Sequence, residues 1–157
     1  MASETIIDLS KIDLNSRLPV AEELDRFLPQ TGHMRMCDGI IWHDERPDKG
    51  VGFKVARPDE FWVAGHIPGR PLMPGVLIIE AAAQLASYLN TKSGRVEGFL
   101  GFTRCDDVSF RGQVLPGDTL YLMASLIDCN RRRFVSHCQG VVNGKLVFDG
   151  KITGMKM

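Results

Sequence analysis

The second half of the chain alternates between hydrophobic and polar positions in several long runs, a pattern typical of strands with one buried face. The last two runs are joined by "VNGK" at residues 142–145, where Asn-Gly is a strong signal for a two-residue hairpin turn. A second turn is predicted at "LPGDT". The strands expected from this pattern span residues 96–104, 107–114, 118–130, 132–143 and 145–156.

The first half predicts two more strands and two helices. Residues 39–56 form two strand-like runs around "RPDKG", and residues 57–73 are a loop dense in Gly and Pro. Residues 16–28 predict a helix with Pro19 in its first turn. Residues 74–90 predict one long helix that is apolar on nearly every side, so we expect it to be buried on most sides.

These elements indicate an α+β fold class, with an antiparallel sheet wrapped around one long central helix. The expected organisation is a single domain over residues 1–157, in which residues 1–15 form an N-terminal extension lying on the body. One sheet covers only one side of such a helix. A partner subunit would complete its burial, so a homodimer is expected.

Composition excludes several classes of protein. Lys and Arg together number 19, as do Asp and Glu, so bulk charge gives no sign of nucleic-acid binding. The apolar stretch at 71–89 contains two prolines, Glu80 and Gln84, which argues against membrane insertion. The N-terminus lacks the apolar region of a secretory signal, and the four cysteines show no CxxC spacing. A cytoplasmic protein with free thiols and no metal is expected.

Candidate chemistry is concentrated in "GHIPGRPLMPGVLIIEAAAQ" at residues 65–84. Glu80 lies on the predicted helix among mostly apolar neighbours, which favours the neutral acid that a proton donor requires. Gln84, one turn later, is placed to hold this carboxyl by a hydrogen bond, and it is also a candidate substrate-binding residue. His66 lies in the preceding loop and has the chemistry of a general base.

The helix start supplies the third component. The N–H groups of Gly75 and Val76 precede the helix's own acceptors, so they are candidates to bind a substrate carbonyl oxygen that gains negative charge. A base, an acid and these donors suggest β-elimination of water from a β-hydroxyacyl compound, or its reverse. Two other interpretations remain open: a merely solvated His66, and an interface ion pair between Glu80 and Arg70 or Arg104.

The pattern H-x-P-G-x-P-x-M-P-G-V-L-x-x-E-A-x-A-Q is matched here at every specified position. It closely resembles the signature of the β-hydroxyacyl-acyl carrier protein dehydratases of type II fatty acid synthesis, which have the hot-dog fold. The resemblance implies that His66 and Glu80 are catalytic and act together from opposite subunits, and that Gly75 is the backbone donor to the thioester carbonyl. Glu80, where the related isomerases usually have Asp, favours the plain dehydratase.

The resemblance also implies substrate and partners. The substrate is a (3R)-3-hydroxyacyl thioester that loses water to give a trans-2-enoyl thioester. The partner is an acyl carrier protein, the assembly is a homodimer or a trimer of dimers, and no cofactor is needed because phosphopantetheine arrives with the substrate. Arg131, Arg132 and Arg133 form a basic cluster that would attract an acidic carrier.

Weaker resemblance extends over residues 24–155, with two departures. Ile67 stands where the family usually has Phe, and Gln30-Thr31 replaces the His-Arg that follows Pro29 in the family. Two alternative functions are kept. One is another hot-dog thioester enzyme, such as an acyl-CoA thioesterase or a dehydratase of CoA esters, and the other is a non-catalytic acyl-binding subunit.

Overall fold

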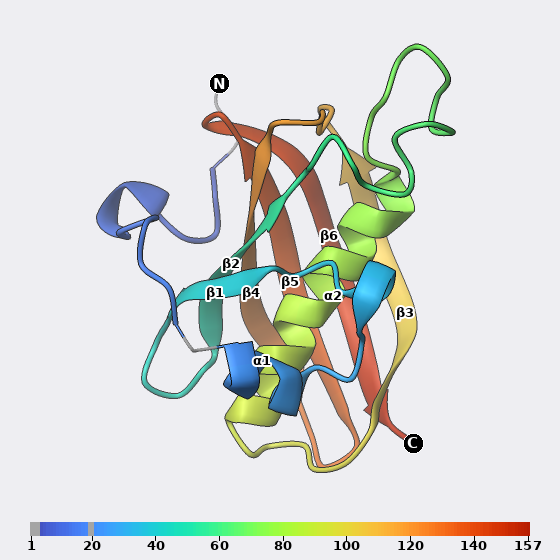
Figure 1. Cartoon of the computed structure of the whole chain (residues 1–157). Coiled ribbons are helices and arrows are strands. Elements are labelled where there is room, and N and C mark those ends of the chain that lie inside the picture. Colours follow the sequence, from blue (N-terminus) through green and yellow to red (C-terminus); the bar gives the residue numbers. More distant parts are fainter. Residues whose placement is uncertain (1–3, 19–20) are drawn as a thin grey trace.

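A long helix held in the curve of an antiparallel sheet dominates the structure, a computed structural model that describes residues 4–18 and 21–157 (Figure 1). The central helix is α2 (Gly75–Lys92), and α1 (Ala21–Phe27) is much shorter. Two 3₁₀ turns, η1 and η2, span Leu9–Lys11 and Gly32–Met34. The strands are β1 (Gly39–His43), β2 (Lys49–Val55), β3 (Leu100–Phe110), β4 (Thr119–Cys129), β5 (Arg133–Val142) and β6 (Lys145–Lys156).

The six strands form one sheet in the order β1-β2-β4-β5-β6-β3, and every neighbouring pair is antiparallel. The predicted α+β class, an antiparallel hot-dog sheet around one long helix, is confirmed. The predicted hairpin is also present. Asn143 and Gly144 both have positive φ angles, 49° and 74°, as a tight turn between β5 and β6 requires.

Three predicted elements were wrong in extent. The strands expected at 96–104 and 107–114 are one strand, β3, whose pairing with β6 shifts register near Phe102 and again after Asp106. Asp107 has a φ of 52° at the second irregularity, so the alternation breaks although the pairing continues. The helix predicted at 16–28 begins only at Ala21, because Leu18 instead pairs with Ile40 in an isolated bridge. Pro19 lies outside the described residues.

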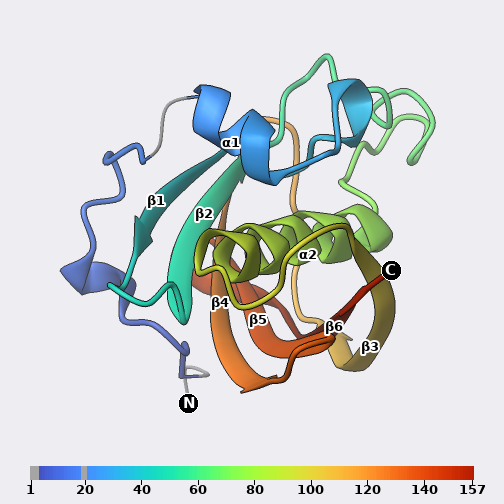
Figure 2. The same cartoon turned by 90° about the horizontal axis from the view of Figure 1, so that it is seen from below.

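Helix α2 lies between the concave face of the sheet and α1 (Figure 2). Its buried residues include Ala81, Ala82 and Ala86, whose small side chains let the strands approach closely, and Leu85, which is fully buried. Burial of a leucine side chain contributes on the order of 2 kcal/mol to folding. The nearly all-round apolar character of residues 74–90 therefore reflects packing on two sides within this one chain.

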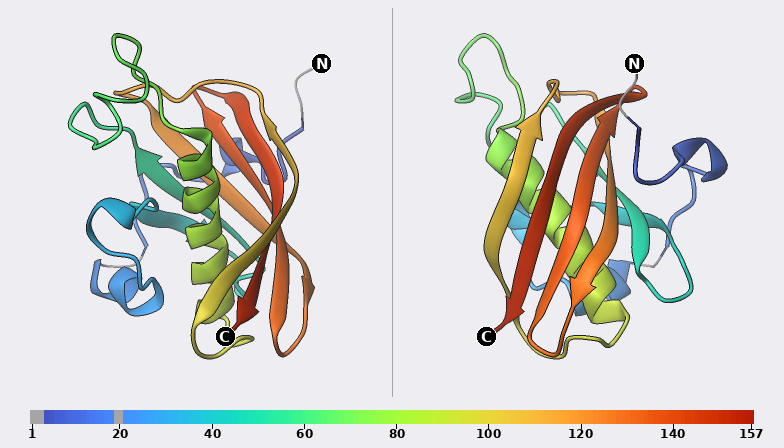
Figure 3. Two further views of the ribbon diagram at one scale, coloured as in Figure 1. Left: turned by 90° about the vertical axis from the view of Figure 1, so that its right-hand side faces the viewer. Right: turned by 180° about the vertical axis from the view of Figure 1, so that it is seen from behind.

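The N-terminal segment packs on the opposite, convex face of the sheet (Figure 3). Ile7 is buried there against Ile41, Val51 and Met123, and the Ile6 N–H donates to Gln139 Oε1 at 2.8 Å. The outer strand β3, by contrast, has mostly exposed residues. Among residues 4–18 and 21–157, no helix is both long enough and apolar enough to span a bilayer.

Candidate active site

His66 is held in the loop between β2 and α2, the green segment that extends beyond the start of α2 in Figure 1. Its backbone N–H donates to the carbonyl of buried Trp62 at 2.8 Å, and its carbonyl accepts from the Leu72 N–H at 2.9 Å. Its ring Nδ1 lies 2.8 Å from the Leu72 carbonyl oxygen. A carbonyl oxygen only accepts, so Nδ1 carries the proton, and the neutral ring has its free lone pair at Nε2. This tautomer suits a general base.

The start of α2 offers free backbone donors next to this loop. Pro74 precedes the helix, and its carbonyl accepts from the N–H groups of Leu77 and Ile78. The N–H groups of Gly75 and Val76 come before the first acceptor within the helix and lie at its positive end. A groove of about 350 Å³ is lined by Leu72, Met73, Gly75, Val76, Ile78, Phe110, Gly112, Gln113 and Val114. Leu72 therefore connects His66 to the groove at the helix start.

Glu80 is held by Gln84, as the sequence predicted. Gln84 Nε2 donates to Glu80 Oε1 at 2.8 Å and to the Met34 carbonyl at 2.7 Å. Gln84 Oε1 accepts from the N–H groups of Met36 and Cys37 at 2.8 and 3.0 Å. Because Oε1 of Glu80 accepts a hydrogen bond, a protonated Glu80 would carry its proton on Oε2.

Gln84, a predicted substrate-binding residue, has its whole side-chain amide engaged within the protein. It is buried, and both hydrogens and the oxygen of its amide are engaged by the contacts above. The sequence could not show that the backbone of residues 34–37 crosses this side of α2 and engages Gln84. Val76 is the opposite case, with a side chain 71% exposed at the groove.

Glu80 opens into a different cavity from the one at the helix start. This small cavity, of about 50 Å³, is lined by Gln30, Glu80, Ala83, Ser87, Leu100, Gly101, Phe102, Phe134, Ile152 and Gly154. Within residues 4–18 and 21–157, no hydrogen bond or ion pair joins His66 to Glu80. The predicted base and acid thus lie at two separate places in one chain, and we call these the His66 half-site, which includes Gly75, and the Glu80 half-site.

Gln30 belongs to the Glu80 half-site, a position that the sequence did not indicate. Its side-chain Oε1 is buried without a hydrogen-bond partner and lies at the cavity that Glu80 lines. Its backbone carbonyl accepts from Arg35 Nε at 2.9 Å, which holds the segment in place. The departure from the family pattern at Gln30 therefore falls beside the candidate acid. Ile67, the other departure, is half exposed in the His66 loop.

The other residues singled out in the sequence lie apart from these half-sites. Arg104 pairs with Asp106 on its own strand, with Nε 2.8 Å from Oδ1, and makes no contact with Glu80. Arg131 and Arg132 are exposed at the turn between β4 and β5, whereas Arg133 pairs with Asp128 at 2.8 Å. All four cysteines are free. Burial raises the pKa of the Cys37 thiol to about 12, so that thiol is a packing group rather than a nucleophile.

A family model described as the FabA-like domain matches residues 28–151, which include both half-sites. The chain belongs to the FabA-like domain family. Solved structures of similar fold include the dehydratase heterocomplex ApeI:P from Xenorhabdus doucetiae, with 14% identity and a TM-score of 0.71 over 85% of this chain and 90% of that one.

Two further structures share the fold at low identity. Cj0977, a sigma28-regulated virulence protein from Campylobacter jejuni, is 18% identical with a TM-score of 0.67, and covers 93% of this chain and 96% of its own. A hypothetical thioesterase from Streptococcus pneumoniae, solved with coenzyme A, is 11% identical with a TM-score of 0.60 over 75% of this chain and 84% of that one. These likenesses show a hot-dog fold that is shared by proteins described as a dehydratase, a virulence protein and a hypothetical thioesterase.

Proposed function

We propose that this protein dehydrates (3R)-3-hydroxyacyl thioesters of an acyl carrier protein to trans-2-enoyl thioesters. The observation that carries the proposal is the pair of half-sites. In the His66 half-site, Nδ1 is bound to the Leu72 carbonyl, which leaves Nε2 free, and Leu72 lines the groove at the helix start. In the Glu80 half-site, Gln84 orients the carboxyl at the edge of a small cavity. The match of residues 28–151 to the FabA-like domain supports this reaction class.

The proposed reaction divides between the two half-sites. His66 Nε2 takes the proton from C2 of the substrate, and the electron pair of that bond moves toward the thioester carbonyl. The Gly75 N–H stabilises the negative charge on the carbonyl oxygen. The pair then forms the C2–C3 double bond as the C3–O bond breaks, and Glu80 Oε2 protonates the departing hydroxyl to give water. Only protons and water move, so no step requires a metal or a redox cofactor.

The two half-sites lie in separate cavities of one chain, so the proposed site combines His66 of one subunit with Glu80 of the partner copy. The edge strand β3 supports this arrangement, because an unpaired edge with exposed apolar side chains favours association with a second copy. Phe102 and Phe110 of β3 are each 48% exposed, and each lines one of the two cavities. A dimer through this edge would bring together residues from both half-sites.

The basic cluster at the β4–β5 turn supports an acyl carrier protein as the partner. Exposed Arg131 and Arg132 at the β4–β5 turn would attract an acidic carrier protein, whose phosphopantetheine arm then delivers the acyl group. The double variant Arg131→Ala and Arg132→Ala tests this contact. It should lower the rate with the carrier-linked substrate and leave the rate with the CoA-linked substrate unchanged.

The decisive experiment is hydration of crotonyl thioester, followed as loss of enoyl absorbance with carrier-linked and CoA-linked substrates in parallel. We expect turnover by the wild type, and a decrease of roughly 100-fold or more in Glu80→Gln and in His66→Ala. Near-full rates in both variants would contradict the assignment. Turnover of the CoA ester alone would show that the protein is a dehydratase of CoA esters.

A thioesterase is the second candidate, because the fold is shared with a hypothetical thioesterase that was solved with coenzyme A. Release of free thiol from acyl-CoA, read with a thiol reagent, distinguishes it from the dehydratase, which leaves the thioester bond intact. Tight acyl-thioester binding without either reaction would instead indicate a non-catalytic acyl-binding subunit.

A further inference from the structure

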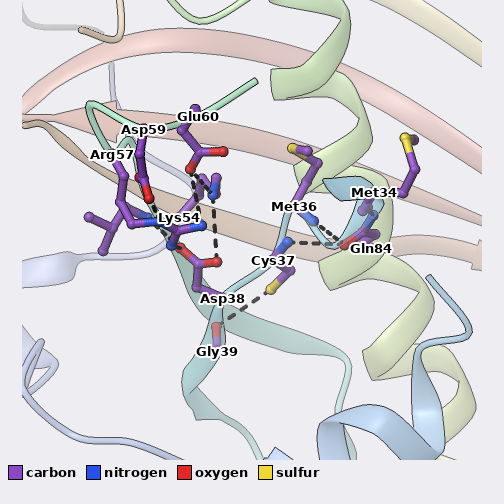
Figure 4. A network of polar contacts seen from close by, with 11 residues as sticks. Met34, Met36, Cys37, Asp38, Gly39, Lys54, Arg57, Asp59, Glu60 and Gln84 are labelled. Atoms are coloured by element: carbon purple, nitrogen blue, oxygen red, sulfur yellow. Dashed lines mark hydrogen bonds and ion pairs between the residues drawn. The ribbon is translucent and has the colours of Figure 1, made fainter. Parts of the chain in front are cut away.

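Lys54 is a fully buried cation on β2, in a place where the sequence pattern "VGFKVA" otherwise reads as an apolar strand. Its Nζ lies 2.6 Å from Glu60 Oε1 and 3.6 Å from Asp38 Oδ1 (Figure 4). Glu60 is almost as deeply buried, with 6% of its side chain exposed. A buried charge is tolerated only when it is compensated, so these groups hold one another in place. Arg57 adds a second cation, 3.3 Å from Glu60 Oε1.

On one side, this cluster holds the loop that carries His66. Glu60 is bound by Lys54 through its side chain and by the backbone through its carbonyl, which accepts from the Val63 N–H at 3.1 Å. The next turn begins at Trp62, whose carbonyl accepts from the N–H of His66. Lys54 is therefore connected to His66 through one short, internally bonded stretch of chain.

On the other side, the cluster holds the segment that orients Glu80. Asp38 Oδ2 accepts from the Val55 N–H at 2.7 Å, and the Asp38 N–H donates to the Phe53 carbonyl at 2.8 Å. The two preceding residues, Met36 and Cys37, donate their N–H groups to Gln84 (Figure 4). Gln84 in turn donates to Glu80. Asp38 thus ends a three-residue segment that is fixed to β2 on one side and to α2 on the other.

We propose that Lys54 is a positioning residue for the proposed elimination, because one buried ammonium group holds both Glu60, in the loop of the base, and Asp38, in the segment that orients the acid. The proposal rests on the proposed function. It extends that function by assigning a role to a residue that touches neither the substrate nor the reacting atoms. An exposed lysine would only contribute its charge. Lys54 is completely buried between two carboxylates on different segments, so it fixes the distance between Asp38 and Glu60.

The test compares Lys54→Met with Lys49→Met, an exposed lysine on the same strand. Crotonyl thioester hydration is measured per folded protein, with folding followed by circular dichroism. For Lys54→Met we expect kcat to fall about 10- to 100-fold, with KM changed less than about threefold, because small displacements of catalytic groups affect the transition state more than substrate binding. Lys49→Met should retain both constants.

A double variant separates positioning from folding. Lys54→Met leaves Glu60 buried without its closest cation and will lower stability, whereas Lys54→Met combined with Glu60→Gln removes both charges and should recover stability. We expect kcat to stay low in the double variant, since the buried contact of Lys54 with both segments is still absent and the half-exposed Arg57 lies 3.9 Å from Asp38 Oδ2. Recovery of kcat together with stability would show that Lys54 only supports folding, and would overturn the inference.

Failure of the inference is distinguishable from failure of the proposed function. An inactive wild type refutes the dehydratase before any variant is measured. An active wild type with an unchanged kcat in folded Lys54→Met refutes only the positioning role. If Lys54→Met does not fold, the double variant provides the same comparison with the wild type.

Discussion

At the scale of single residues, Gln84 determines more of the candidate site than its place in the sequence motif suggests. One buried amide holds the Glu80 carboxyl, the Met34 carbonyl and two backbone N–H groups. The carboxyl that it orients has its other oxygen free to carry the proton that the proposed reaction transfers. An apolar side chain of similar size would fill the same space but leave these partners unsatisfied.

Gln84→Leu is therefore expected to lower both stability and activity. Loss of the acceptor strands the N–H groups of Met36 and Cys37, which should reduce the free energy of unfolding by about 2 to 4 kcal/mol. The rate of crotonyl thioester hydration should fall as well, because Glu80 loses its orientation. Urea unfolding and the hydration assay measure the two effects. Gln113→Leu, at an exposed position, is the stability control, and an equal loss there would contradict the argument.

At the scale of elements, α1 is joined to the C-terminal half of α2 by a polar contact at its edge. Glu23 accepts hydrogen bonds from Lys92 and from the Tyr88 hydroxyl, while Phe27 packs edge-on against the Tyr88 ring. The hydrogen bond from Lys92 is the main cause that lowers the pKa of Glu23 below its usual 4.5, and it outweighs the opposing effect of burial. Docking of α1 is thus sensitive to acid.

Acid should lower the stability that the contact of Glu23 with Lys92 contributes. The pKa of Glu23 is lower in the folded state, so its contribution to stability is complete above about pH 4.5 and is lost as the pH falls through the folded-state value. Because the pair is partly exposed, the contribution should be at most about 1 kcal/mol. In Lys92→Met, the part of the stability lost on acidification should shrink. Urea unfolding from pH 7 to pH 3 tests this.

Exposed Lys145→Met is the control for that series, since its stability should follow the wild type at every pH. A Lys92→Met curve that runs parallel to the wild type down to pH 3 would mean that Glu23 gains nothing from Lys92. The polar contact between α1 and α2 would then rest on the Tyr88 hydroxyl, beside the packing of Phe27 on the Tyr88 ring.

At the scale of the whole molecule, the separation of the two half-sites is the main consequence of the fold. Gly75 and Glu80 are close in sequence on one helix, yet they line different cavities, one at the start of the helix and one further along it. The proposed site is therefore a property of two chains. A site made by two chains predicts that two inactive variants regain activity when they are mixed, which a site within a single chain would not allow.

Mixing His66→Ala with Glu80→Gln should restore activity that neither variant has alone. In a mixed dimer, one site combines both defects and the other combines an intact His66 with an intact Glu80. Random exchange makes half of the dimers mixed, so about a quarter of wild-type activity is expected. The hydration assay, after co-expression or subunit exchange, measures it. No recovery, in a sample shown by light scattering to contain dimers, would place both residues of each site in one chain.

The sequence by itself determined the architecture and the chemical inventory. Alternation and the Asn-Gly turn predicted the β5–β6 hairpin, and the apolar run after Pro74 predicted the central helix, because both depend on local periodicity. Helical spacing also predicted the hydrogen bond between Gln84 and Glu80, since residues four apart share a helix face.

Only the tertiary structure decided what depends on contacts between distant segments. The backbone of residues 34–37 saturates Gln84, Leu18 leaves the predicted helix to pair with Ile40, and Lys54 lies buried between Asp38 and Glu60. The periodicity of the sequence cannot predict these contacts, because each depends on how β2, α2 and the loops pack against one another. The same packing places Gly75 and Glu80 in separate cavities, which their closeness in the sequence conceals.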